Sequence, residues 1–155
     1  MSAIAQLNDN LKAFEKQKKD LIKNVKKDLK SVLKELFSTI PEIKSIYWTQ
    51  YSPYFNDGDE CRFRIAEVVF YNFVPDRPFR YAEQIDDDEY PEGSWAYSEY
   101  SLKESNLPKE VIDFLSNFDT TINANREFIK EIFGDHSIVS FTINGIEVSE
   151  YTDHD

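Results

Sequence analysis

The sequence predicts an α+β fold: a long N-terminal helix, then an antiparallel sheet of two hairpins covered by two helices from the C-terminal half. Three observations support this. Residues 8–37 contain neither proline nor glycine, strand-like segments flank Asp57-Gly58, and two more flank Asn144-Gly145. With 155 residues, including 12 Phe, 9 Tyr and 2 Trp, the chain is large enough to bury a single core.

The first predicted element is a helix over residues 8–37. Lys, Leu, Ala and Glu dominate it, and Pro41 closes the region because proline cannot continue a helix. A helix of about 30 residues is about 45 Å long, and a small domain is about 30 Å across. We therefore divide the chain into an N-terminal helix, residues 1–37, and an acidic α+β domain, residues 38–155, and expect part of the helix to extend beyond the domain.

Apolar residues recur along this helix at three- and four-residue steps, as in a coiled-coil heptad. After Val25 the apolar positions become 29, 32, 33 and 36, a pattern typical of docking on a sheet. We expect the first half of the helix to form a homo-oligomer, with Lys18 in the seam setting register or oligomer number. The predicted oligomerisation residues are Ile4, Leu7, Leu11, Phe14, Lys18, Leu21 and Val25.

Charge is divided between the two parts. Five acids and nine lysines give residues 1–37 about +4 and leave about −15 on the remainder of a chain with net charge −11. Because nucleic-acid binding depends on Lys and Arg neutralising phosphates, direct binding is not expected, and the lysines are interpreted as the solvated flank of the seam. A single cysteine, Cys61, and the lack of a secretory signal or a run of about 18 apolar residues predict a cytoplasmic protein without membrane association.

The first predicted hairpin joins strands over residues 45–55 and 60–73. Asp57-Gly58 fits the centre of a type I′ turn, which places Tyr51 opposite Arg64 and Tyr54 opposite Cys61. Pro53 cannot donate to a strand ladder, so we expect a bulge or an edge there.

This hairpin contains a block that resembles a segment of small uncharacterised proteins from phages and bacteria, written WTQYTPYFNDGD. Residues 47–63 read YWTQYSPYFNDGDECRF, with Ser52 where that pattern has threonine. The resemblance implies a phage origin, a location in the host cytoplasm and a host protein as partner, and it carries no catalytic residues.

The rest of the chain supplies a long acidic connection, two helices and a second hairpin. Residues 74–103 form the connection, with a further strand possible over 94–101. A helix is predicted from Pro108 to about Phe118 and another, capped at Asp119 or Thr120, to Phe133. Asn144-Gly145 predicts a turn between strands 137–143 and 146–151. One face of this hairpin then carries Val139, Phe141, Ile143, Ile146 and Val148.

No enzyme motif is present, so neither catalytic residues nor cofactors are predicted. Pairing of Cys61 with His136 as a nucleophile is weighed against a cysteine that only packs, and packing is favoured. The acids at 57–60 and 86–89 fit no calcium-loop spacing, so they are interpreted as turn and solvated residues, without a metal site.

The function that the sequence favours is a non-catalytic interaction protein that oligomerises through its helix and presents its acidic body to a partner. The alternative is a binder of a small anionic ligand or nucleotide, because two arginines and two tyrosines share one face of the first hairpin. A less favoured reading is an acidic mimic of nucleic acid. The candidate ligand-binding residues are Tyr47, Tyr51, Arg62 and Arg64.

Overall fold

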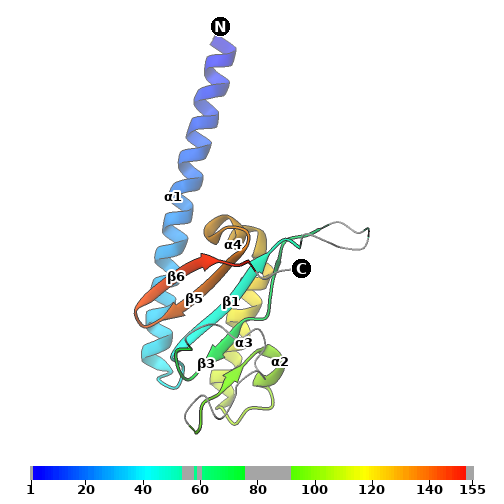
Figure 1. The fold of residues 1–155 in the computed structure, drawn as a ribbon. Coiled ribbons are helices and arrows are strands. Elements are labelled where there is room, and N and C mark those ends of the chain that lie inside the picture. Colours follow the sequence, from blue (N-terminus) through cyan, green and yellow to red (C-terminus); the bar gives the residue numbers. More distant parts are fainter. Residues whose placement is uncertain (1, 54–57, 59–60, 76–91, 153–155) are drawn as a thin grey trace.

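A computed structural model describes residues 2–53, 58, 61–75 and 92–152. The architecture is α+β, as predicted: a sheet with helices packed behind it, and one long helix that extends past both (Figure 1). The helices are α1 (Ser2–Thr39), α2 (Glu99–Leu102), α3 (Lys109–Ala124) and α4 (Arg126–Phe133). The strands are β1 (Ser45–Tyr51), β2 (Arg64–Ile65), β3 (Val69–Tyr71), β4 (Ala96–Tyr97), β5 (Ser137–Thr142) and β6 (Gly145–Glu150).

Helix α1 is the longest element and joins the projecting part of the molecule to its core. It has 38 residues, about 57 Å of helix, and ends at Thr39, just before Pro41. Leu33 and Leu36 are buried in the core of the body, with exposed fractions of 4% and 1%. The C-terminal half of the helix is therefore part of the domain it precedes.

The sheet has the strand order β4-β3-β1-β5-β6, with β2 also paired to β1, and the strand pairs are antiparallel. Tyr51 lies opposite Arg64, as predicted. The returning strand is not continuous, because the register to β1 shifts by one residue between β2 and β3. An extra residue in one strand is a bulge, and here it lies near Ala66 rather than at Pro53.

The second predicted hairpin forms, but its turn is displaced. Thr142 pairs with Gly145, so the two turn residues are Ile143 and Asn144, and Gly145 begins β6. The Thr142 hydroxyl accepts a hydrogen bond from the Asn144 N–H at 3.2 Å, which stabilises this turn locally. Ile143 is consequently 81% exposed instead of facing the core.

The two helices of the C-terminal half are divided at Asn125, not near Asp119 as predicted. Asp119 is buried within α3, which continues to Ala124, and Gly134 ends α4 as expected. Phe118 and Ile122 of α3 pack against the sheet. The prediction took Asp119 as a helix cap, because Asp is common at caps. Asp also occurs inside a helix where the tertiary structure provides a partner for its carboxyl group.

Trp48 is the centre of the core. Its ring lies 5.0 Å from Phe141, 6.0 Å from Phe133 and 6.4 Å from Phe118, centroid to centroid. These contacts join β1 and β5 of the sheet to α3 and α4, so the two layers share one aromatic core. Aromatic pairs at such distances contribute beyond their buried area.

Several expectations fall outside the described residues: the partner position Tyr54, most of the first turn and the acidic run at 86–89. Gly58 is described, and its φ of 97° agrees with the positive φ expected in that turn. From the long connection the structure describes β4, where the rings of Trp95 and Tyr97 stack at 4.7 Å.

Candidate functional site

The N-terminal part of α1 extends beyond the body (Figure 1). Its apolar side chains are exposed. The exposed fractions are 55% for Ile4, 57% for Leu7, 54% for Leu11 and 65% for Phe14. We call these four residues the projecting seam. Residues three and four apart on a helix lie on one face, so the seam is a continuous apolar stripe.

The seam reaches the body at Lys18. Its Nζ lies 2.9 Å from Oε2 of Glu131 in α4, with both side chains about half exposed at 47% and 53%. An ion pair this exposed contributes little stability. It shows where α1 meets the body but does not hold the two together. Beside it, Phe14, Leu21 and Phe128 line a largely apolar groove of about 260 Å³ between α1 and α4.

Beyond the junction the same stripe faces the core. Ile22, Val25 and Leu29 are half-buried against it. Two residues that the heptad spacing assigned to oligomerisation, Lys18 and Val25, thus contact the protein's own body. The change from free to docked helix lies between Lys18 and Ile22, about one turn before the change in apolar spacing, because α4 approaches α1 there.

The arginine and tyrosine face is only partly assembled. The Arg64 guanidinium lies 4.9 Å from the centre of the Tyr51 ring, a cation–π distance, and the Tyr51 ring also lies 5.2 Å from that of Tyr151. Tyr47 lies about 13 Å further along β1, where its ring meets Tyr71 edge-on at 5.5 Å. Arg62 is exposed. The structure brings Tyr51 and Arg64 together and places Tyr47 in a separate aromatic cluster.

A hollow of about 550 Å³ between β2, α2 and α3 has three acids, Glu67, Glu99 and Asp119, in its lining, together with Arg126. Asp119 is buried there, 6% exposed. Burial, followed by a hydrogen bond and charge repulsion from Glu99 and repulsion from Glu67, raises the pKa of Asp119 to about 7. The Asp119 carboxyl therefore holds a proton at mildly acidic pH. Sequence reasoning took Asp119 as a helix cap and did not find this cluster.

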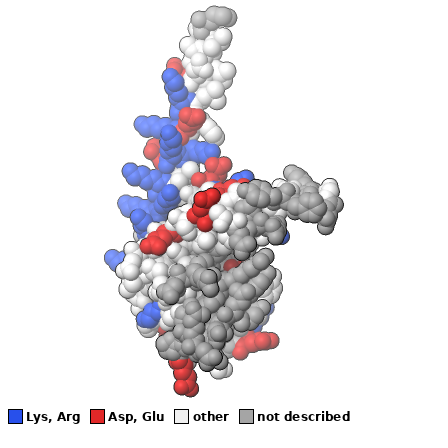
Figure 2. Space-filling model, in the orientation of Figure 1, with Lys and Arg blue, Asp and Glu red and all other residues white. Residues whose placement is uncertain are grey.

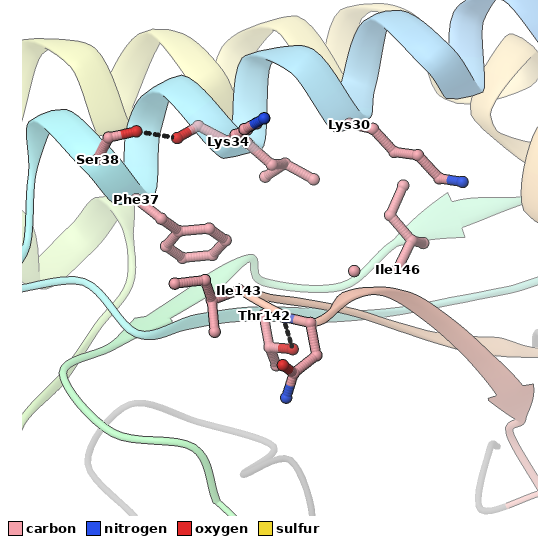
Figure 3. A pocket seen from close by; sticks show the side chains of 10 residues that line it. Lys30, Lys34, Phe37, Ser38, Thr142, Ile143 and Ile146 are labelled. Carbon is pink, nitrogen blue, oxygen red and sulfur yellow. Dashed lines mark hydrogen bonds between the residues drawn. The ribbon is translucent and has the colours of Figure 1, made fainter.

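A second hollow, of about 410 Å³, separates the docked half of α1 from the β5–β6 turn (Figure 3). Phe37 points toward Ile143 across it, and Ile146 faces the helix from the strand side. Lys30 and Lys34 lie at its helical wall. The surface of this hollow is mostly apolar, and the charged side chains in its lining are the two lysines.

Cys61 was expected to pack as a small apolar side chain, in preference to pairing with His136 as a nucleophile. Cys61 is an exposed free thiol. His136 follows α4 and has a positive φ of 55°, and its Nε2 lies 3.7 Å from Oδ1 of the adjacent Asp135. The expected packing of Cys61 is wrong, because its thiol is exposed.

Among the described residues, no helix is long and apolar enough to cross a membrane. Within the same ranges, no group of three or more His, Cys, Asp or Glu side chains is arranged to hold a metal ion. The chain matches no protein-family model, and comparisons with curated proteins and with solved structures give no significant match.

Proposed function

We propose that this protein is a non-catalytic interaction protein that self-associates through the projecting seam of α1. The observation that carries the proposal is the seam itself: four apolar side chains, each more than half exposed, on a helix that extends into solvent (Figure 1). An apolar stripe of this length is costly to leave in water, and a second copy offers the same stripe.

The residues flanking the seam favour a second copy of this chain as the occupant. With Ile4 and Leu11 at a positions and Leu7 and Phe14 at d positions, the flanking e and g positions are mostly neutral. Two copies can therefore approach without a row of like charges across the interface. The flanking residues are Asn8, Asn10, Glu15 and Gln17.

The position of the body favours an antiparallel pair. The stripe that is free up to Phe14 is covered by the body from Ile22 onward, so the body lies on the seam side of the helix. Two parallel copies would place both bodies at the same end of the seam, where they compete for the same space. In an antiparallel pair the bodies lie at opposite ends, and each N-terminus points toward the α1–α4 groove of the other copy.

The proposal also includes a partner for the body. An antiparallel pair displays two acidic bodies pointing apart, each available to a separate protein. From the resemblance of residues 47–63, we propose a host protein as that partner.

Light scattering on the full chain tests self-association. The intact chain is expected at twice the monomer mass, and Leu7→Asp/Leu11→Asp at the monomer mass, because two carboxylates would be buried in the seam. Gln6→Asp/Ala13→Asp adds the same charge outside the seam and should stay dimeric. A monomeric intact chain, or equal dissociation of both variants, contradicts the proposal.

A further inference from the structure

Eight of the nine lysines of α1 lie on one side of the helix, adjacent to the seam, and the ninth, Lys18, lies in line with the seam (Figure 2). At about 100° per residue, every position in a sector of about 100° between residues 12 and 34 is a lysine, and all are exposed. Glu15 and Asp20 fall just outside this sector. We call this set the lysine row: Lys12, Lys16, Lys19, Lys23, Lys26, Lys27, Lys30 and Lys34.

Neither the fold nor self-association accounts for the row. In the described part of the chain, the ion pair between α1 and the body uses Lys18, which is not a row member. In the heptad of the seam the row occupies b, c and f positions, which face away from a partner helix. The eight lysines outnumber the two acids that border the row, Glu15 and Asp20, so this side of α1 keeps a net positive charge that attracts an anionic partner.

We propose that the lysine row binds the phosphate backbone of double-stranded nucleic acid. The row spans about 33 Å, close to one turn of B-form DNA, with a lysine about every 5 Å. Lysine is a hydrated point charge, suited to contacts with phosphate that do not read bases. The proposal does not rest on self-association.

Three features separate this partner from other polyanions. The row includes no aromatic side chain on which single-stranded bases could stack. It has no apolar side chain to form the centre of a protein interface. A bilayer would need the apolar stripe beside the lysines, but from Ile22 onward that stripe is covered by the body while the row continues to Lys34.

The net charge of −11 led us to expect no direct nucleic-acid binding. We depart from that expectation because the row concentrates positive charge on the exposed side of α1, away from the core it packs on (Figure 2). Repulsion by the acidic body keeps the interaction weak and strongly dependent on salt.

Fluorescence anisotropy with a labelled 20-base-pair duplex of arbitrary sequence tests the proposal on the full chain. Binding is expected at about 50 mM salt and should weaken steeply toward 200 mM. Lys16→Gln/Lys19→Gln/Lys23→Gln should weaken binding at least about 10-fold and reduce the slope of log affinity against log salt by about 2 to 3.

A matched control removes the same charge elsewhere. Lys44→Gln/Lys103→Gln/Lys109→Gln changes three exposed lysines of the body and should keep the affinity within about twofold of the intact chain. If both triple variants weakened duplex binding equally, the loss of affinity would follow from net charge alone, and the proposal would be overturned. So would absence of duplex binding at 50 mM salt, or binding of phosphatidylserine vesicles without binding of the duplex.

Discussion

The indole Nε1 of Trp48 donates a hydrogen bond to Oε1 of Gln50 at 2.9 Å. Gln50 is fully buried, and its Nε2 donates to the backbone carbonyls of Gly134 at 2.6 Å and Ile129 at 3.3 Å. The amide thus satisfies both the polar atom of the central aromatic residue and the C-terminal end of α4. This link fixes α4 to β1, and α4 in turn defines where α1 leaves the body.

Replacing Gln50 by leucine is expected to destabilise the protein by about 2–4 kcal/mol. The leucine fills similar volume but leaves the buried Trp48 N–H and the part-buried Gly134 carbonyl without their partner, and an unsatisfied buried group costs about 1–3 kcal/mol. Urea unfolding followed by Trp fluorescence measures the loss. Thr49→Val, on the opposite face of β1, should change the free energy of unfolding by less than about 0.5 kcal/mol; a Gln50→Leu change that small would refute the role of the amide.

The Gln50 network shows what sequence patterns reveal and what they miss. Helix α1, the class of fold and the Tyr51–Arg64 register follow from local signals: apolar periodicity, glycine turns and strand propensity. The two backbone carbonyls that accept hydrogen bonds from Gln50 lie 79 and 84 residues away along the chain, and no local signal indicates them. The same holds for the junction at Lys18, because Glu131 belongs to a helix whose approach depends on the whole core.

The candidate site divides in the same way. The projecting seam follows from heptad spacing, whereas its end at the body does not, which is why Lys18 and Val25 were assigned to it. The lysine row was present in the spacing of the sequence but was interpreted as a solvated flank. Because one face of α1 is docked, the row from Lys12 to Lys27 lies away from both seam and core, while Lys30 and Lys34 line the hollow beside the β5–β6 turn.

Asp135 is expected to stabilise the fold at neutral pH and to lose that effect in acid. Its carboxylate accepts hydrogen bonds from the Ser52 N–H at 2.8 Å and the Ser52 hydroxyl at 2.7 Å. Burial raises the pKa of Asp135, but the hydrogen bonds from Ser52 and the His136 N–H outweigh burial and lower it overall. The contribution is therefore present above the unfolded pKa of about 3.9 and disappears as pH falls through the lower, folded pKa.

Asp135→Asn should accordingly cost about 1–2 kcal/mol of unfolding free energy at pH 7, with a cost that shrinks as pH is lowered toward 3. Urea unfolding at several pH values measures both. A cost that is constant across this range would show that the charge of Asp135 does not matter.

Asp119 should have the opposite pH dependence. Its pKa of about 7 in the folded protein exceeds the unfolded value of about 3.9, so the folded state binds the proton more tightly. The stability that the Asp119 carboxyl contributes is therefore fully present below about pH 4 and is lost as pH rises toward 7. Asp119→Asn removes the charge and should raise the free energy of unfolding by about 1–2 kcal/mol at pH 8, and by much less at pH 5.

The exposed Asp113 on the same helix provides the control for Asp119. Asp113→Asn should change the free energy of unfolding by less than about 0.5 kcal/mol at either pH. If Asp119→Asn were no more stabilising at pH 8 than at pH 5, the carboxyl would not be carrying a proton between these values.

The two halves of α1 should respond differently to the same substitution. Leu36→Ala, in the docked half, is expected to lower stability by about 2–5 kcal/mol at any protein concentration, because it opens a cavity in the core. Leu11→Ala, in the projecting seam, should lower the melting temperature only where the protein is self-associated. Thermal unfolding at about 1 and 100 µM separates the two, and a concentration-independent effect of Leu11→Ala would argue against a seam shared by two copies.

Disulfide formation between copies is expected to report the antiparallel arrangement. In an antiparallel pair centred on the seam, Ile4 of one copy faces Phe14 of the second, while the two Ile4 residues are about 15 Å apart along the axis. A disulfide needs Cα atoms within about 7 Å. With the native thiol removed by Cys61→Ser, an equal mixture of Ile4→Cys and Phe14→Cys chains should crosslink readily under mild oxidation, and either variant alone should not. Parallel copies would crosslink in each variant alone, because each residue then faces its own counterpart. An efficient dimer of Ile4→Cys chains on a non-reducing gel would therefore show that the two copies are parallel, although they would still associate through the seam.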